Sequence, residues 1–164
     1  MPSAQAAQAA GFVAEYLTKQ GNGPRRDEMA GFVARYGSDA DLTGIVGWGE
    51  KSLSAADQIA LARAVAQGRQ AGGKPPLQAQ KTWTSALVRS LITQTTPQAG
   101  NQLTAATELA ALMGLTDLAE PIIAVGRDAG RADAVRVTAL ESADRKSTRL
   151  NSSHEDLSRM PSSA

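Results

Sequence analysis

The sequence contains no cysteine, and its single histidine is His154, close to the C-terminal end. Residues 1–143 therefore cannot form the common zinc sites, a Cys-His or Ser-His nucleophile, or the Cys-x-x-Cys-His motif that attaches haem. Aromatic residues are scarce as well, with two each of Phe, Trp and Tyr. Small apolar residues, mainly alanine, take their place, and this composition favours close contacts between helices over a core of large rings.

The sequence also has no apolar run that approaches the ~20 residues needed to cross a bilayer. Residues 1–10 are rich in Ala and Gln and do not form a secretory signal. Basic and acidic side chains are equally numerous in residues 1–143, so their net charge does not direct them to nucleic acid or to an anionic membrane. We expect no nucleic-acid partner and no membrane span, and the compartment stays open.

The C-terminal residues have a different character. Residues 144–154, DRKSTRLNSSH, resemble a translated short-read sequencing adapter, and residues 158–164, SRMPSSA, resemble the translated end of the same oligonucleotide. Segments left by processing are set aside before a fold is inferred. We therefore expect the natural chain to end near Ala143, and residues 144–164 to be an artefactual tail, disordered or accidentally helical, that packs on nothing.

Residues 1–143 read as helices separated by short breaks, without sustained strand-like alternation. The clearest break is Gly72-Gly-Lys-Pro-Pro76, because Gly ends helices and Pro cannot continue them. Ser38 or Asp39 is placed to cap the third helix, and Ser54, followed by Asp57, is placed to open the fourth. The expected helices span roughly residues 4–19, 25–36, 41–51, 54–70, 77–93, 98–113, 117–127 and 132–142.

An internal echo favours a repetitive build. The segment AGFVAEY at 10–16 recurs as AGFVARY at 30–36. Two helices of that spacing would make one helical hairpin, and solenoids built of hairpins repeat every ~40 residues. Chance similarity in an Ala-rich helical sequence is the alternative. In the helix that contains the first copy, an apolar stripe at helical spacing, which we expect to face the core, is formed by Phe12, Val13, Tyr16 and Leu17.

The most specific pattern lies in residues 112–140. A first helix containing a proline is followed by a short turn at 127–131 and by a second helix with the order Asp-x-Val-Arg-x-x-Ala-Leu. This segment resembles a HEAT repeat. The resemblance implies that the Asp and Arg contact neighbouring turns and repeats, while the Val, Ala and Leu fill the seam between helices. The signature residues, with a structural role, are Pro121, Asp133, Val135, Arg136, Ala139 and Leu140.

A wider resemblance covers most of residues 28–143. It rests on the order and the spacing of three segments: FVARYG at 32–37, IALARAVAQG at 59–68 and LAALMG at 109–114. Their order is similar to the helical part of large haem-binding, membrane-bound-dehydrogenase-type proteins of planctomycete and verrucomicrobial bacteria. Those proteins carry a propeller-like region, HEAT repeats and a cytochrome-c-like domain. The resemblance implies a fragment of a multidomain redox protein, whereas this stretch itself has no haem motif and no assigned cofactor.

Several groups of residues suggest a site at first sight, yet each has an ordinary structural explanation. The basic cluster suits a solvated helix start, the carboxylates suit helix caps, the tryptophans suit a core, and the glycines suit close helix contacts. No catalytic arrangement and no phosphate-binding fingerprint emerges. These groups are Lys19, Arg25 and Arg26; Asp39, Asp41 and Glu50; Trp48 and Trp83; and Gly44, Gly47 and Gly49.

We predict an all-α fold, an α-solenoid of antiparallel HEAT-like hairpins, that serves as a non-enzymatic scaffold for a protein partner or for neighbouring domains. The alternative is a HEAT-like nucleic-acid-binding module or a DNA-repair glycosylase, which needs a basic groove around an aromatic residue and a carboxylate. A stand-alone helical bundle is the third possibility. The alternative requires convergence on one face of Arg63, Arg69, Lys74, Lys81, Arg89 and Trp83.

Overall fold

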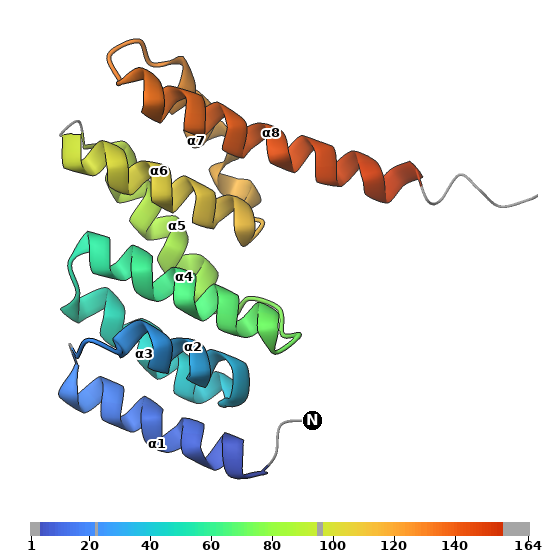
Figure 1. Ribbon diagram of the computed structural model, residues 1–164. Coiled ribbons are helices and arrows are strands. Elements are labelled where there is room, and N and C mark those ends of the chain that lie inside the picture. The colour runs from blue at the N-terminus through green and yellow to red at the C-terminus, as the bar shows by residue number, and fades with distance from the viewer. Residues whose placement is uncertain (1–3, 22, 95–96, 156–164) are drawn as a thin grey trace, which may run out of the picture. The chain divides into compact units, whose positions relative to one another are not determined.

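The computed structural model describes residues 4–21, 23–94 and 97–155, with the backbone alone for 97–98 and 145–155. Within these ranges it contains eight α-helices, one short 3-10 helix and no strand (Figure 1), which confirms the all-α prediction. The elements are α1 (Ala4–Gln20), α2 (Arg26–Tyr36), α3 (Asp39–Ser52), α4 (Ala55–Ala71), α5 (Gln78–Ile92), α6 (Pro97–Leu112), η1 (Thr116–Leu118), α7 (Ala119–Arg127) and α8 (Asp133–Glu155). No helix in the described part is long and apolar enough to span a membrane.

The chain divides into two compact units, Met1–Val88 and Arg89–Ala164, and α5 spans the boundary between them. The backbone of α8 stays helical to Glu155, beyond Ser142, where we predicted the eighth helix to end. The side chains of residues 145–155 and all of residues 156–164 lie outside the described residues. The interpretation of residues 144–164 as an unpacked, artefactual tail therefore stays a prediction.

In the first unit, α2 lies between α1 and α4, and α3 packs against α1 (Figure 1). The buried face of α1 consists of Ala10, Ala14 and Leu17. The expected stripe is thus correct for Leu17 and wrong for Phe12 and Tyr16, which are 73% and 49% exposed. Alanine occupies the positions nearest the neighbouring helices because a small side chain permits a close approach, and this directs the two rings outward.

The closest helix contact in this unit is the crossing of α2 and α4. A Cβ atom placed on Gly68 of α4 would lie 2.2 Å from the carbonyl oxygen of Gly31 in α2 and 2.9 Å from the Cβ of Ala34. A Cβ atom on Gly31 would lie 3.3 Å from the carbonyl oxygen of Ala64. The two backbones meet here, so the crossing depends on the missing side chain of Gly68.

Side-chain caps fix where α3 and α4 begin. The Ser38 hydroxyl accepts the Asp41 N–H at 3.1 Å, and the Asp41 carboxylate accepts the Ser38 N–H at the same distance. The Ser54 hydroxyl likewise accepts the Asp57 N–H and donates to the Asp57 carboxylate at 2.6 Å. Both predicted caps are confirmed, with Ser38 rather than Asp39 as the cap of α3.

The second unit has its own core, in which α8 packs against α6 and α7. Leu118 from η1 and Ile122 and Val125 from α7 are buried, as the hairpin interpretation of this segment expects. The short turn between α7 and α8 is closed by Asp128, whose carboxylate accepts the Gly130 N–H at 2.9 Å. The helices α7 and α8, which are adjacent in sequence, thus fold back on one another.

Candidate functional site

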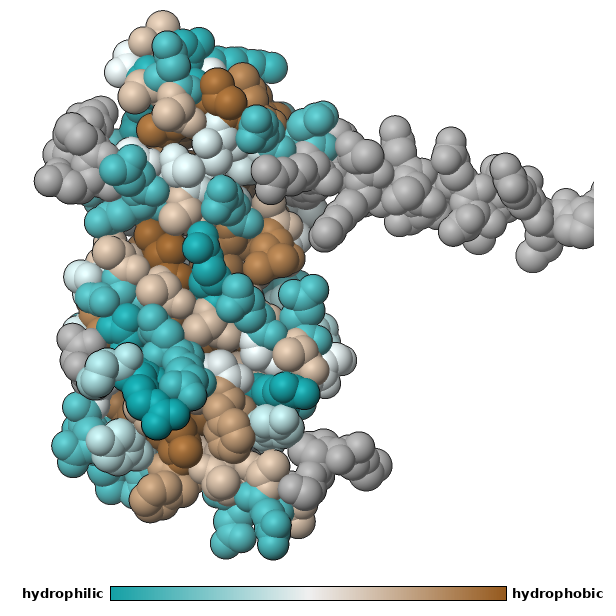
Figure 2. All heavy atoms as spheres, viewed as in Figure 1, coloured by the Kyte–Doolittle hydropathy of each residue, from teal (hydrophilic) through white to brown (hydrophobic). Residues whose placement is uncertain are grey.

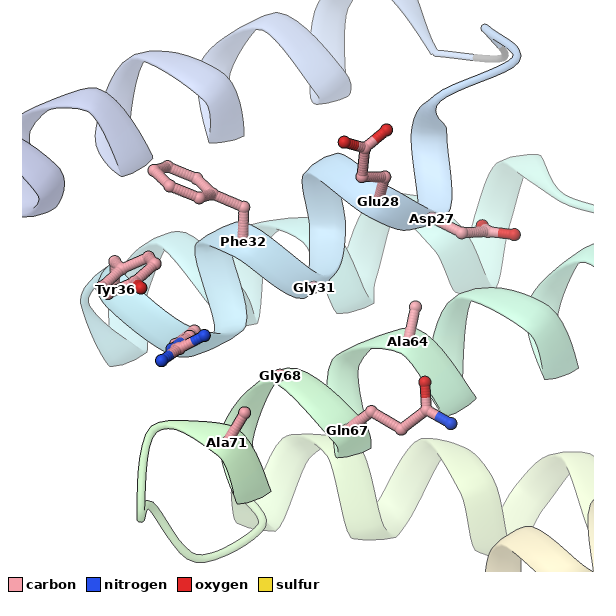
Figure 3. A pocket seen from close by; sticks show the side chains of 10 residues that line it. Asp27, Glu28, Gly31, Phe32, Tyr36, Ala64, Gln67, Gly68 and Ala71 are labelled. Carbon is pink, nitrogen blue, oxygen red and sulfur yellow. The ribbon is translucent and has the colours of Figure 1, made fainter.

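An open groove of about 490 Å³ lies between α2 and α4 in the first unit (Figure 3). Its floor is the α2–α4 crossing, where Gly31 faces Gly68, so only backbone and small side chains line the bottom. Because no side chain fills the space above these two glycines, the groove is deepest between the larger side chains of the two helices. The residues that line the groove are Asp27, Glu28, Gly31, Phe32, Arg35, Tyr36, Ala64, Gln67, Gly68 and Ala71.

One wall of the groove is aromatic. Phe32 and Tyr36, one helical turn apart on α2, hold their ring centroids 5.0 Å apart at an angle of 54°. The guanidinium carbon of Arg35 lies 5.0 Å from the centroid of the Tyr36 ring, a cation–π contact. Arg35 is exposed and pairs with no carboxylate in the described part of the chain. Its charge is therefore available to a bound group.

The opposite end of the groove carries two carboxylates that are already paired. Arg26 donates to Asp27 at 2.8 Å, and Arg25 donates to both oxygens of Glu28 at 2.9 and 2.8 Å. The hydrogen bonds from Arg25 lower the pKa of Glu28, and the same pair raises the pKa of Arg25. Both carboxylates of this end are therefore already paired, and Arg35 is the cation of the groove that has no carboxylate partner in the described part of the chain.

The predicted basic cluster is not an anion-binding corner. Lys19 pairs with Glu15 at 2.6 Å, Arg25 pairs with Glu28, and the buried Arg26 also reaches Asp57 at 3.1 Å. Each of these cations therefore has a carboxylate partner of its own. The ordinary explanation, a charged helix start, accounts for them.

The candidate carboxylates, tryptophans and glycines of the first unit have structural roles or open surroundings. Trp83 is 3% exposed and donates its indole N–H to Gln58 at 2.9 Å, which confirms its place in the core. Trp48 is half-buried and lies against Gly21. A Cβ atom on Gly49 would lie 2.6 Å from Leu61, whereas Cβ atoms on Gly44 and Gly47 would meet nothing within 4 Å.

No group of three or more His, Asp or Glu side chains that could hold a metal ion occurs among the described residues. Asp39 accepts from Arg69 at 2.5 Å and Asp41 caps α3, while Glu50 is exposed at the end of the same helix. None of these three carboxylates lines the groove between α2 and α4.

The nucleic-acid alternative requires Trp83 as an exposed ring, and this ring is buried. Arg69 is 4% exposed and donates to the carbonyl of Pro75 and to Asp39, and Lys74 donates to the carbonyl of Gly37 at 2.9 Å. Arg89 belongs to the second unit and pairs with Asp117, while Arg63 is exposed and Lys81 half-buried. With Trp83 buried, no ring among them is available to stack on a base.

The repeat-signature residues lie at the α7–α8 seam. Asp133 pairs with Arg136 at 3.0 Å, and Arg136 also donates to the carbonyl of Gly126 at 3.3 Å. Val135 and Ala139 are buried. Leu140 remains 45% exposed, yet its Cγ is only 2.5 Å from where a Gly126 Cβ would stand.

Pro121 is the third residue of α7 and is half-buried. Proline is tolerated in the first turn of a helix because its missing N–H would be unpaired there. Its position therefore requires no bend in α7.

Long-range hydrogen bonds tie successive turns together within each unit, and we did not predict them. In the first unit Lys74 donates to the Gly37 carbonyl, 37 residues earlier. In the second unit Arg131 donates to the Gln94 carbonyl at 2.6 Å, again 37 residues earlier, and to the Ile92 carbonyl. Each of these two donors lies 37 residues after its acceptor. No motif and no helical periodicity in the sequence identifies these pairs, so sequence reasoning missed them.

Comparisons of this chain with protein-family models, with curated proteins and with solved structures give no match.

Proposed function

We propose that this chain is a non-catalytic helical-repeat scaffold, a HEAT-like α-solenoid, that holds a segment of a partner protein or of a neighbouring domain in the α2–α4 groove. The observation that carries the docking function is the groove itself: a floor of backbone and alanine, an aromatic wall, and the unpaired Arg35. At the acidic end, Asp27 and Glu28 are already paired with Arg26 and Arg25.

The packing of alternate helices supports the repeat architecture. α2 packs on α4 in the first unit, and α6 packs on α8 in the second. Stacked hairpins bring every second helix into contact in this way. The Lys74–Gly37 and Arg131–Gln94 bonds span 37 residues each, which is close to the ~40 residues of a hairpin repeat.

We further propose that the scaffold serves a larger haem-binding redox protein. The order of the segments at 32–37, 59–68 and 109–114 supports this assignment, together with the signature at 133–140. In such an assembly the redox chemistry belongs to other domains, and the helical array positions them. The groove would then receive a segment of an adjacent domain.

The shape and charge of the groove define what it would bind. A small-residue floor admits an apolar side chain, the rings of Phe32 and Tyr36 cover it, and Arg35 attracts a carboxylate. The matching ligand is an extended peptide that places an Asp or Glu next to a large apolar residue.

Selection from a random 12-residue peptide library on the purified chain tests this function. We expect selected peptides to be enriched in Asp or Glu beside Leu, Phe or Met. Arg35→Glu should weaken their binding about tenfold, because replacing an attraction with a repulsion at a solvated site costs about 1.4 kcal/mol.

The matched control is Arg127→Glu, the same charge reversal at an exposed position in α7 of the second unit. It should leave peptide binding unchanged. Peptides that bind Arg35→Glu as tightly as the unmodified chain, or a library that yields no binder, would refute the docking function.

A further inference from the structure

A second surface, formed by α1, lies outside the groove. Apolar side chains lie over this helix in Figure 2, and Phe12 and Tyr16 on it are 73% and 49% exposed. Ala7 is exposed as well, and a Cβ atom on Gly11, one turn later, would meet nothing within 4 Å. The helix thus presents two rings and a small-residue surface that nothing in the described chain covers.

The α2–α4 crossing shows what such a surface can hold. On α2 the receiving residue is Gly31, followed by Phe32 in the wall of the groove. On α4 the inserting pair is Ala64 and Gly68, one helical turn apart, whose backbones approach Gly31. The contact therefore has two halves. Helix α2 supplies a glycine followed by a phenylalanine, and α4 supplies two small residues separated by three others.

Helix α1 carries both halves, and Gly11 is common to them. By the echo between residues 10–16 and 30–36, Gly11 and Phe12 correspond to Gly31 and Phe32. Ala7 and Gly11 have the same spacing and residue types as Ala64 and Gly68. A surface that holds both halves of a contact is self-complementary, and this is the requirement for a two-fold dimer.

The charges on α1 also suit a second copy of the same helix. Glu15 and Lys19, its two charged residues, pair with each other at 2.6 Å. Two copies of the helix therefore approach without net charge on either side. We propose that two copies of this chain associate through α1, with the helices crossing at Gly11 and the rings of Phe12 and Tyr16 covering the crossing.

The proposal is independent of the docking groove, because it uses other residues and a different helix. One helix per copy buries less area than a standard protein interface, so the dimer is weak and its population depends on concentration. Dissociation in the micromolar range or above is expected.

Sedimentation equilibrium from ~1 µM to ~500 µM, a range that brackets a weak complex, measures the dimer directly. We expect Gly11→Leu and Phe12→Glu each to weaken dimerisation at least tenfold. Gly11→Leu should leave the helix content of the monomer unchanged, because the Gly11 position opens into free space. Gly11→Ala should keep the dimer within about threefold, since alanine is small enough for a close crossing.

The control is Val137→Glu, a substitution of an exposed apolar residue in α8 of the second unit that should leave dimerisation unchanged. The absence of native cysteine permits a second test, oxidation of Gly11→Cys and of Val137→Cys at equal concentration. Crossing at Gly11 predicts rapid disulfide-linked dimers for the former alone.

A chain that stays monomeric across the whole concentration range would overturn the proposal. A dimer that persists unchanged in both Gly11→Leu and Phe12→Glu would overturn it equally, and so would equal cross-linking rates for the two cysteine variants.

Discussion

Gly68→Ala tests whether the crossing of α2 and α4 depends on backbone contact. The added methyl group would lie 2.2 Å from the Gly31 carbonyl oxygen and 2.9 Å from Ala34, so the two helices must move apart. Neither obstacle is the far end of a flexible side chain that could turn away. The same substitution in α3, at Gly44, adds a methyl group that meets nothing within 4 Å.

The two substitutions should have opposite effects on the free energy of unfolding. Replacing Gly by Ala inside a helix stabilises a protein by about 0.5–1 kcal/mol. Gly44→Ala should show that gain in full. At Gly68 the overpacking costs about 1–3 kcal/mol, and the cost lies in the upper part of that range because backbone blocks the methyl group. We therefore expect a net loss of about 2 kcal/mol for Gly68→Ala and a gap of about 3 kcal/mol between the variants.

Urea unfolding followed by tryptophan fluorescence measures this difference. Both tryptophans, Trp48 and Trp83, lie in the first unit, so the signal reports the unit that contains the crossing. A gap of this size is easily resolved, since it exceeds the usual error of extrapolation to zero denaturant. If Gly68→Ala raised the midpoint as Gly44→Ala does, the backbone contact between α2 and α4 would not exist as described.

Two further substitutions test the other contacts. Arg131→Ala removes the donor to the Ile92 and Gln94 carbonyls and should destabilise the second unit by about 2 kcal/mol. Hydrogen exchange of the amides in the last turn of α5 should then become faster. The control, Arg127→Ala, should have no such effect. The hydrogen bond from Ser54 and the contact with Arg26 lower the pKa of Asp57 below its ordinary 3.8, so its charged form stabilises the fold above that pH and the contribution is lost as pH falls through the lowered pKa. The difference in unfolding free energy between the native chain and Asp57→Asn should therefore be constant from about pH 7 to 5 and shrink below pH 3.8; a difference that grows toward acid would contradict this.

Sequence reasoning located helices well because their boundaries depend on local chemistry. Ser38 and Ser54 bond to N–H groups three residues away, so each cap is readable without knowing the fold. The third helix, weakened by its glycines, nevertheless extends from Asp39 to Ser52. Its cap and the burial of Leu42 and Ile45 outweigh the intrinsic cost of those glycines.

The groove was not predictable in the same way, because it arises where α2 and α4 cross. Helical periodicity states which face of a helix is apolar but not which partner covers it. The choice of Phe12 and Tyr16 as core residues failed for this reason: the neighbouring helices selected the alanine face of α1. Gly31 and Gly68 are unfavourable helix residues by intrinsic propensity, and only their contact shows why they fit there.

Lys74 and Arg131 each bind a main-chain carbonyl far back in the sequence, so these contacts depend on the path of the backbone and not on the side chain of the acceptor. Lys74 and Arg131 donate to main-chain carbonyls, which every amino acid provides. The residue at Gln94 could thus change in many ways without loss of the bond. Gly37 is fixed by packing instead, because a Cβ atom there would lie 2.7 Å from the carbonyl oxygen of Val33. The segment at Gln94 can therefore vary in sequence and still accept the bond from Arg131, provided that its length is preserved. At this position we expect insertions to be tolerated less well than substitutions.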